Sequence, residues 1–258
     1  MQFPKITIIT VTYNSEKFLL DCIKSVQIQN YSEIEHIIID GCSSDRTVDI
    51  IKANEHSIAK WISEKDKGMY DAINKGIALG SGEIIGILNS DDVLASPDVI
   101  SNIAKAFMEQ NIDSLYGDIV YVDTLNLNKV LRTWKGSPYK RVKFNYGWMP
   151  AHPTFYIRAN LIKKYGGYEQ SFSSAADYEF MSRYLYKYHV NSFYLPMLIV
   201  KMRIGGQSNE SILGRIRANR RDYLAMKKNE IHFPVLVSVL KPLRKIPQFY
   251  NSLLNYFM

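Results

Sequence analysis

Short β-branched runs alternate with amphipathic segments over the first 110 residues, and this alternation constrains the fold more than any other feature. Residues 5–13, KITIITVTY, read as a strand buried on both faces. Three further strands are predicted at residues 34–39, 59–62 and 83–88. Helices are predicted after Asn14-Ser15, after Ser44-Asp45, over 69–79 and after Ser96-Pro97-Asp98. Strands and helices at this spacing predict an α/β fold with a mostly parallel sheet.

The regular alternation of strands and helices ends after residue 110. Strands are predicted at 114–123, 129–134, 152–158 and 192–203, and helices at 176–188 and 210–228. No internal repeat or flexible linker interrupts the pattern. We therefore expect one integrated domain, residues 1–208, followed by a basic helical extension, residues 209–258.

The composition is that of an ordinary globular protein, with 47% hydrophobic and 22% charged residues. The two cysteines, Cys22 and Cys42, are too few for a disulfide framework or a structural zinc site. The start of the chain lacks the charged region and cleavage site of a secretory signal, and no apolar run approaches the roughly 20 residues of a membrane span. We expect a cytoplasmic protein.

Charge is unevenly distributed. The net charge is +7, yet residues 1–200 carry a local −1 and residues 201–258 a local +8. A neutral body with a basic end favours a polyanionic partner, such as nucleic acid, anionic lipid or a phosphorylated substrate. A non-enzymatic polyanion-binding protein is therefore one open alternative, although no nucleic-acid-binding motif accompanies the basic residues and nucleic acid is not the expected partner.

Polar side chains follow each of the first four predicted strands. They are Thr12, Tyr13 and Asn14; then Asp40, Gly41 and Ser43; then Glu64, Asp66 and Lys67; then Asn89, Ser90, Asp91 and Asp92. In open α/β sheets the ligand binds outside the carboxyl ends of the strands. Each group alone could be a turn or a helix cap, but their shared position at one sheet edge predicts a binding site.

Asp91 and Asp92 are adjacent carboxylates directly after a buried strand. They repel one another unless a positive group neutralises them, and their oxygens suit a hard ion such as Mg²⁺ or Mn²⁺. Such an ion can bind a diphosphate and stabilise its charge as it leaves. The alternative is a solvated turn in which Asp92 caps the next helix. The chain has neither the phosphate loop G-x-x-x-x-G-K-[ST] nor the dinucleotide fingerprint, so a P-loop NTPase or dinucleotide oxidoreductase is not supported.

Four motifs in order carry a resemblance to a known family. They are Ile8-Ile9-Thr10-Val11-Thr12-Tyr13-Asn14, Ile39-Asp40-Gly41-Cys42-Ser43-Ser44-Asp45, Asp66-Lys67-Gly68-Met69-Tyr70-Asp71-Ala72-Ile73-Asn74 and Leu88-Asn89-Ser90-Asp91-Asp92. A weaker continuation comprises His152-Pro153-Thr154, Gly166-Gly167-Tyr168, Ala176-Asp177-Tyr178-Glu179 and Gly205-Gly206-Gln207-Ser208. The chain resembles the family-2 glycosyltransferases of the GT-A fold, and most of all bacterial enzymes that build capsular, exopolysaccharide or O-antigen units.

The resemblance implies a nucleotide-sugar half, residues 1–110, and an acceptor half, residues 111–208. The implied donor-binding residues are Thr12, Tyr13 and Asn14 in the nucleotide pocket, Asp40 at the uracil or ribose, Asp66 and Lys67 beside the nucleotide, and Asn74 near the sugar and phosphates. Asn89-Ser90-Asp91 takes the place of the family's D-x-D motif. Its first position is Asn89 rather than Asp, which affects the usual ribose contact and leaves Asp91 and Asp92 to hold an Mn²⁺ or Mg²⁺ ion.

Asp177 matches the family's catalytic base. It would take a proton from an acceptor hydroxyl while the sugar leaves a nucleoside diphosphate, and one displacement would invert the anomeric centre. The resemblance implies a nucleotide-diphospho-sugar donor, in the first place a UDP-sugar, and a saccharide or polyprenyl-linked acceptor in surface polysaccharide biosynthesis. His152 and Trp148 are candidate acceptor-site residues, although a lone histidine is more often structural. A sugar-phosphate nucleotidyltransferase remains an alternative, but its Gly- and Arg-rich phosphate loop after the first strand is missing.

The extension combines basic residues between Arg215 and Lys228, an apolar run over 233–240 and an aromatic end that includes Phe249 and Tyr256. Apolar stretches flanked by Lys, Arg and aromatic residues resemble an interfacial membrane anchor. A peripheral contact with the inner face of the cell membrane would suit a lipid-linked acceptor. The alternative is a helix packed on the domain with a solvated basic face.

Overall fold

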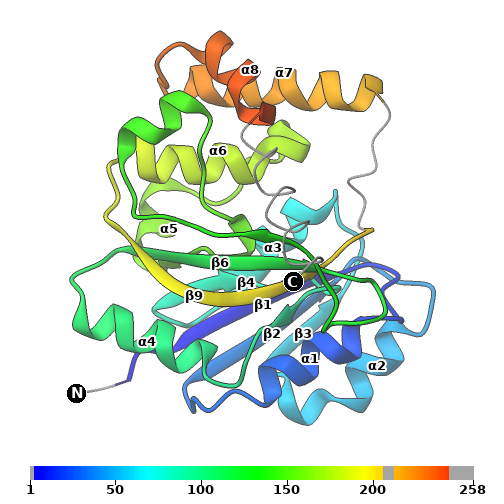
Figure 1. Cartoon of the computed structure of the whole chain (residues 1–258). Helices are drawn as coiled ribbons and strands as arrows, with labels where there is room; N and C mark the ends of the chain where they lie inside the picture. The colour runs from blue at the N-terminus through cyan, green and yellow to red at the C-terminus, as the bar shows by residue number, and fades with distance from the viewer. Residues whose placement is uncertain (1–2, 206–211, 244–258) are drawn as a thin grey trace.

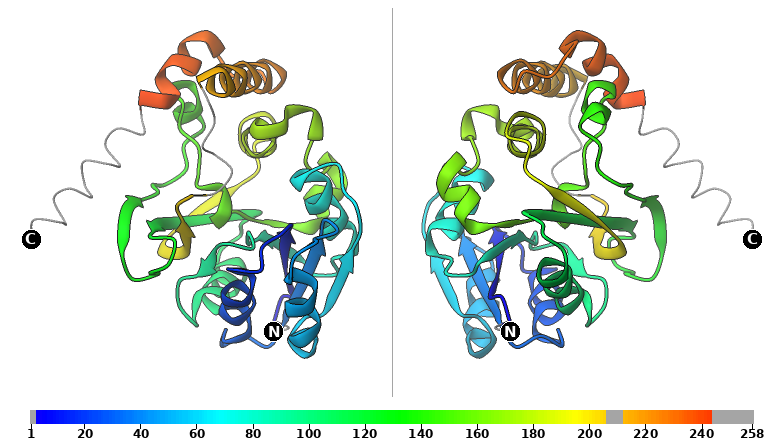
Figure 2. Two further views of the ribbon diagram at one scale, coloured as in Figure 1. Left: turned by 90° about the vertical axis from the view of Figure 1, so that its right-hand side faces the viewer. Right: turned by 90° about the vertical axis from the view of Figure 1, so that its left-hand side faces the viewer.

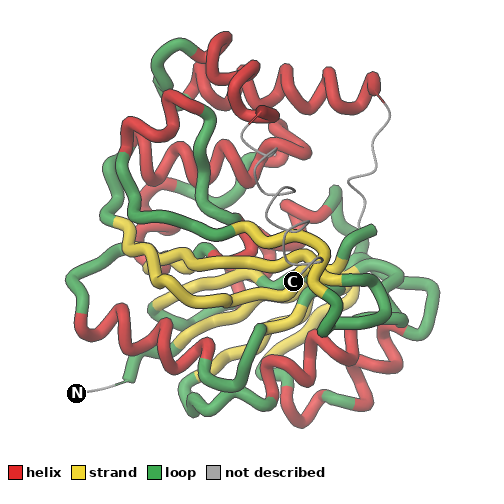
Figure 3. The backbone as a smooth tube through the Cα atoms, in the orientation of Figure 1, coloured by secondary structure: helices red, strands yellow, loops and turns green. Residues whose placement is uncertain are grey.

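A twisted central sheet with helices on both faces forms the body of the molecule (Figures 1 and 3). The computed structural model describes residues 3–205 and 212–243. Within those residues, nine strands form one sheet in the order β3-β2-β1-β4-β8-β6-β9-β5, and β7 pairs with β6. The strands are β1 (Ile6–Thr12), β2 (Ile34–Asp40), β3 (Lys60–Ser63), β4 (Ile84–Ile87), β5 (Val93–Leu94), β6 (Ser114–Val122), β7 (Val130–Trp134), β8 (Tyr156–Arg158) and β9 (Ser192–Arg203).

The first four long strands form the parallel part of the sheet. β1 pairs in parallel with β2 on one side and β4 on the other, and β2 pairs in parallel with β3. The strand order therefore reverses beside β1, which is where open α/β sheets bind ligands. Thr12 lies in register with Asp40, and Asp40 with Ser63, so the carboxyl ends of three strands meet in one row.

The rest of the sheet is mixed. β8 is antiparallel to both β4 and β6, and β7 is antiparallel to β6, whereas β6 and β9 run parallel. The predicted α/β class is confirmed. The predicted predominance of parallel pairs holds for β1 to β4 only.

Side chains of alternate residues along β1 face different helices. Ile9 and Val11 pack in one cluster with Ala72 and Ile73, whereas Ile8 packs in another with residues of the first and fourth helices. This period of two is what a strand buried on both faces requires. The helices of the body are α1 (Leu19–Gln27), α2 (Thr47–Ala53), α3 (Met69–Leu79), α4 (Val99–Glu109), α5 (Ala159–Tyr165) and α6 (Ala176–Ser182). Short helical turns add η1 (Glu55–Ser57), η2 (Arg141–Tyr146), η3 (His152–Thr154), η4 (Gln170–Ala175) and η5 (Arg183–Lys187).

Two predicted elements are only partly of the expected type. The strand predicted over 152–158 begins only at Tyr156, because η3 occupies the first residues and Pro153 has no N–H to donate to a sheet. The helix predicted over 176–188 is α6 up to Ser182, and η5 continues it as a wider turn.

The described part of the C-terminal extension, residues 212–243, forms two helices, α7 (Ile212–Lys228) and α8 (Pro234–Leu243), which cover α6 and η2 (Figure 2). The Nζ atom of Lys241 lies 2.6 Å from an Asp222 carboxylate oxygen and 3.7 Å from the centre of the Tyr178 ring. Both helices thus pack on the acceptor half. Gly206-Gln207-Ser208 and the aromatic end, 244–258, lie outside the described residues. No helix in the described part of the chain is long and apolar enough to cross a membrane.

Candidate active site

The loop after β1 is joined to the loop after β2. The backbone N–H of Asn14 donates to Ser43 Oγ at 2.8 Å, and Asn14 Oδ1 accepts the N–H of Ser44 at 2.9 Å. Asn14 has a φ of 49°, a left-handed conformation that asparagine adopts more readily than most residues. The position predicted to line the nucleotide pocket therefore also fixes the relation between two of its loops.

Asp40 ends β2 with its side chain fully buried. Its carboxylate accepts the Ser43 hydroxyl at 2.5 Å, the Ser43 N–H at 3.0 Å and the Ser63 hydroxyl at 2.6 Å. Two carboxylate oxygens offer about four acceptor positions. Three of these positions are occupied, so the predicted contact of Asp40 with uracil or ribose would have to use the one that remains.

Gly41 lies between two predicted donor-binding side chains. A Cβ atom at this position would come within 2.6 Å of Asp66 Oδ2 and 3.4 Å of the Tyr13 ring. The ring of Tyr13 is 60% exposed, so it offers an open aromatic face beside the Asp66 carboxylate. Such a face can stack on a nucleobase.

The remaining donor candidates differ in their accessibility. Thr12 is buried, and its hydroxyl has no hydrogen-bond partner among the described residues. Lys67 is exposed, and its backbone N–H donates to Asp71. Ser90 is buried and its hydroxyl lies 2.9 Å from that of Ser15, which ties the loop after β4 to the loop after β1.

The adjacent carboxylates after β4 occupy different environments. Asp92 is fully buried; its Oδ2 accepts the Asn89 amide at 2.9 Å, and its Oδ1 has no partner among the described residues. Asp91 is partly exposed. Burial raises the pKa of both carboxyls, and the charge of Asp91 raises that of Asp92 further.

Arg203, at the end of β9, is the main positive group at this pair. It is buried, and its guanidinium donates to the carbonyl of Asp91 at 2.7 Å and to the carboxylate of Asp21 at 2.5 Å. Its charge lowers the pKa of both carboxyls but does not outweigh their burial. Arg203 is not among the site residues predicted from the sequence, although an arginine at the end of an apolar strand is a signal that could have identified it.

The carboxylate pair fits a divalent cation. Within the described residues no group of three or more His, Cys, Asp or Glu side chains could hold a metal by itself. Mg²⁺, however, commonly uses only one or two protein carboxylates and takes its other oxygens from substrate phosphates and water. The buried Oδ1 of Asp92, which has no partner among the described residues, is an oxygen that a bound cation would satisfy.

Asp177 stands in the first turn of α6, as predicted. Its Oδ1 accepts the N–H of Tyr178 at 2.8 Å, and its Oδ2 lies 3.3 Å from His152 Nδ1. The Asp177 side chain is 19% exposed and that of His152 is 38% exposed, so both remain within reach of a ligand. The structure thus brings together two residues that the sequence separates by 25 positions.

Three other candidates have mainly structural surroundings. Trp148 is buried in an aromatic cluster with Tyr116 and Phe144, so an acceptor role for it stays a prediction that its burial does not favour. The Asn74 amide is bonded on both sides to the backbone of Tyr168. Glu179, two residues beyond Asp177, is fully buried against Arg183 and therefore does not compete for a ligand.

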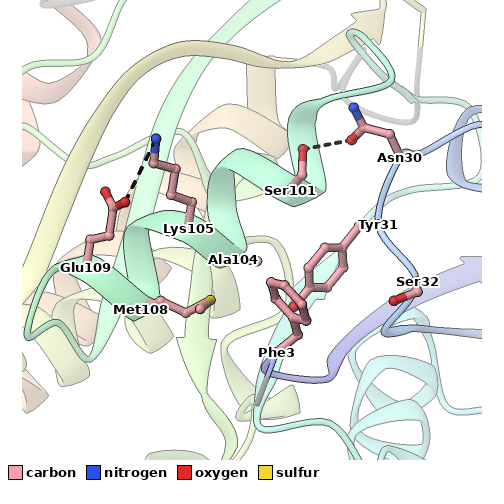
Figure 4. A pocket seen from close by; sticks show the side chains of 9 residues that line it. All are labelled: Phe3, Asn30, Tyr31, Ser32, Ser101, Ala104, Lys105, Met108 and Glu109. Carbon is pink, nitrogen blue, oxygen red and sulfur yellow. Dashed lines mark hydrogen bonds and ion pairs between the residues drawn. The ribbon is translucent and has the colours of Figure 1, made fainter. Parts of the chain in front are cut away.

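A separate hollow lies between α4 and the residue stretches before β1 and β2 (Figure 4). Phe3, Tyr31 and Met108 supply its apolar lining. It lies at the amino ends of β1 and β2, whereas the residues predicted to bind the nucleotide and a metal follow the carboxyl ends of β1 to β4, and Asp177 lies in α6. The hollow is therefore distinct from the candidate active site.

Known proteins share both the sequence pattern and the fold. The model of the family described as glycosyl transferase family 2 matches residues 7–166. An uncharacterised glycosyltransferase of Mycobacterium tuberculosis is 36% identical over 185 residues, which cover 70% of this chain and 68% of that protein. A PGL/p-HBAD biosynthesis glycosyltransferase of Mycobacterium bovis is 28% identical and covers 81% of each chain.

Solved structures agree with the fold. TarS of S. aureus has a TM-score of 0.67 at 18% identity, with 87% of this chain matched to 39% of TarS. A mannosyltransferase of Pyrobaculum calidifontis, solved with GDP-Man and Mn²⁺, has a TM-score of 0.67 at 16% identity, and the match covers 99% of this chain and 75% of that one. Both neighbours are GT-A glycosyltransferases. The chain adopts the GT-A fold and belongs to glycosyltransferase family 2.

Proposed function

We propose that this chain is an inverting, metal-dependent glycosyltransferase that moves a sugar from a nucleotide-diphospho-sugar to a hydroxyl of an acceptor. The observation that carries the proposal is the partly exposed Asp177 carboxylate, held by the Tyr178 N–H and contacted by His152. It lies in the acceptor half, while the donor candidates lie at the carboxyl ends of the parallel strands.

The chemistry requires a base because a hydroxyl is a poor nucleophile. As the acceptor oxygen bonds to the anomeric carbon and the bond to the diphosphate breaks, Asp177 takes the hydroxyl proton. A single displacement of this kind inverts the anomeric configuration. Tyr13, Gly41 and Asp66 would receive the nucleotide, since they form the open part of the donor loops.

Asp91 and Asp92 would hold a divalent ion, Mn²⁺ or Mg²⁺. When bound, such an ion supplies positive charge to the leaving diphosphate. Asp91 is the more accessible of the two, and Asn89 and Arg203 hold the loop that presents it. The P. calidifontis mannosyltransferase was solved with Mn²⁺, which supports a metal in this chain.

The donor we propose is a UDP-sugar, because TarS was solved with UDP and with UDP-GlcNAc. The acceptor would be a saccharide, free or linked to a polyprenyl lipid, in the synthesis of a surface polysaccharide. The M. bovis relative is likewise a glycosyltransferase of a biosynthetic pathway, that of PGL/p-HBAD.

A peripheral membrane contact belongs to the same proposal. Phe233, just before α8, and Val235 and Leu236 in its first turn are 73%, 67% and 52% exposed. Lys227, near the end of α7 and six residues before Phe233, is also exposed. Apolar side chains next to basic ones bind anionic lipid surfaces. We name residues 233, 235 and 236 the α8 surface.

Incubation of the protein with nucleotide sugars and Mn²⁺ tests the proposal. We expect release of a nucleoside diphosphate and formation of a glycoside with inverted configuration, and both should fail in EDTA and in Asp91→Asn. Release of pyrophosphate would instead support a sugar-phosphate nucleotidyltransferase. Turnover that is equal with and without EDTA would contradict the metal role.

A further inference from the structure

Asn74, in the middle of α3, uses its whole side-chain amide to hold the backbone of one distant residue. Its Nδ2 donates to the carbonyl of Tyr168 at 2.8 Å, and its Oδ1 accepts the N–H of Tyr168 at 2.8 Å. The amide thus pairs with Tyr168 as a neighbouring strand would. Gly167 makes this approach possible, since a Cβ atom there would lie 2.4 Å from Asn74 Oδ1.

The same contact continues through aromatic rings to the helix of the proposed base. The ring of Tyr70, one turn before Asn74 on α3, stacks on Tyr168 at 5.5 Å. Tyr168 in turn stacks on Phe180 of α6 at 4.1 Å with the planes only 3° apart. Tyr70 also faces Asp177 itself: burial raises the pKa of Tyr70, and the negative charge of Asp177 raises it further.

The helical turn η5, which continues α6, holds the same loop through Arg183. Arg183 donates to the carbonyls of Gly166 at 3.0 Å and Gly167 at 2.6 Å, and it also donates to Tyr165. The backbone of residues 165–168 is therefore held by Asn74 of α3 and by Arg183 of η5, which continues α6. α3 itself starts at Met69, two residues after Lys67, which with Asp66 is a donor-binding candidate.

We propose that Asn74 is a positioning residue: through Tyr168 it fixes α6, and with it Asp177, at a set distance from the donor loop. The inference rests on the proposed function of Asp177 as base. It replaces the expected role of Asn74 as a direct contact of the sugar and phosphates, because its donor and its acceptor are both engaged by Tyr168. We use the name α3–α6 clasp for the contacts among Asn74, Tyr168, Tyr70 and Phe180.

The two roles predict opposite changes in Asn74→Ala. A positioning residue leaves donor affinity within about twofold of the wild type and lowers kcat for transfer by about 10- to 100-fold, since small misplacement of a reacting group has a cost of this size. A donor contact would instead weaken UDP-sugar affinity in a direct titration. Loss of affinity with kcat unchanged would overturn the proposal.

Hydrogen exchange supplies a readout that needs no substrate. The Tyr168 N–H loses its acceptor in Asn74→Ala, so its exchange should become faster while exchange in β1 stays unchanged. Asn102→Ala, on the remote helix α4, is the matched control and should change neither exchange at Tyr168 nor kcat. Faster exchange with wild-type kcat would show a contact that does not position the base, and would overturn the proposal.

Gly167→Ala is the second variant, should Asn74→Ala fail to fold. It keeps Asn74 but forces the amide away from the loop, so it should reproduce the slow transfer and the fast exchange at Tyr168. Wild-type behaviour of Gly167→Ala in both measurements would count against the clasp. Failure of the base assignment is recognised separately, by transfer that survives Asp177→Asn in an otherwise wild-type chain.

Discussion

Asp177 has one carboxylate oxygen engaged by a backbone N–H and a second oxygen that faces His152. The N–H of Tyr178 holds Oδ1, which leaves Oδ2, 3.3 Å from His152 Nδ1, as the oxygen that can take a proton. The side chain sits in the first turn of α6, so the backbone of that helix also fixes its position. Its direction is thus set by two elements before any acceptor binds.

Asp177→Asn should abolish transfer without weakening nucleotide-sugar binding. The amide keeps the shape but cannot accept the proton, so the rate should fall by about 10²–10⁴. Transfer kinetics and a donor titration check both halves of this expectation. Glu109→Gln, an exposed carboxylate of α4, is the control, and transfer by Asp177→Asn within a few-fold of wild type would show that another group is the base.

Motifs predicted where the site residues lie but not what their side chains contact. Asp177 begins a helix as expected, and the donor candidates follow the strands as expected. Asn74 and Arg203 illustrate the limit, because their partners lie 94 and 112 residues away in the chain. Spacing within a motif carries no information about such contacts.

At the scale of elements, α6 is supported by a buried ion pair. Glu179 is fully buried; its carboxylate lies 3.0 Å from the Arg183 guanidinium and 3.1 Å from the Lys228 ammonium of α7. Asn229 adds a hydrogen bond from its amide to the Glu179 carbonyl at 3.0 Å. The C-terminal extension therefore helps to hold α6, the helix that carries Asp177, and also presents the α8 surface.

Arg183→Met should destabilise the fold by about 3–5 kcal/mol, because it leaves a buried carboxylate short of its main partner. Urea unfolding measures the loss. The double variant Glu179→Gln/Arg183→Met should recover part of it, since the uncompensated charge is gone. Lys105→Met is the control: it breaks the exposed pair with Glu109 and should lower the free energy of unfolding by no more than about 1 kcal/mol. An equal loss of stability in Arg183→Met and Lys105→Met would contradict the role of burial.

Local periodicity predicted most of the elements, whereas the pairing of strands that are distant in the sequence was not predictable. β1 to β4 and α3 appear where the apolar pattern placed them. The parallel pairing of β6 with β9 joins Ser114 to Ser192, and no turn signal announces such a pairing. η3 takes the place of the first three residues of the strand predicted over 152–158, because Pro153 has no N–H to donate to a neighbouring strand.

At the scale of the whole molecule, one buried histidine links stability to pH. His36 in β2 is 2% exposed, and burial lowers its pKa from 6.5 to about 4. Between pH 4 and 6.5, His36 therefore binds a proton in the unfolded chain but not in the folded chain. The free energy of unfolding falls as the pH falls from 6.5 towards 4. The loss is on the order of 3 kcal/mol in total.

Urea unfolding at several pH values between 5 and 7 checks this expectation (~1.4 kcal/mol per unit at most from one group). His36→Gln should flatten the profile, because glutamine does not titrate. His56→Gln, at an exposed position, should keep the wild-type slope. A His36→Gln profile as steep as the wild type would assign the pH dependence to other groups.

The α8 surface makes a second whole-molecule prediction. Replacing Phe233, Val235 and Leu236 by serine should reduce sedimentation with anionic vesicles and leave transfer to a water-soluble acceptor unchanged, because these side chains are exposed. Leu125→Ser, at a 90% exposed position in the loop after β6, is the control. Equal sedimentation of the triple variant and wild type would reject membrane binding through this surface.

The parallel pairing of β6 with β9 also sets an order for synthesis of the chain. β1 to β4 can assemble once the first 87 residues have emerged from the ribosome. The edge of β6 that pairs with β9 stays unpaired until residues 192–203 have been synthesised. At about 5–20 residues per second, that wait lasts several seconds or more. During it, the nascent protein displays a row of unpaired N–H and C=O groups, which is the kind of strand edge that aggregates or recruits a chaperone.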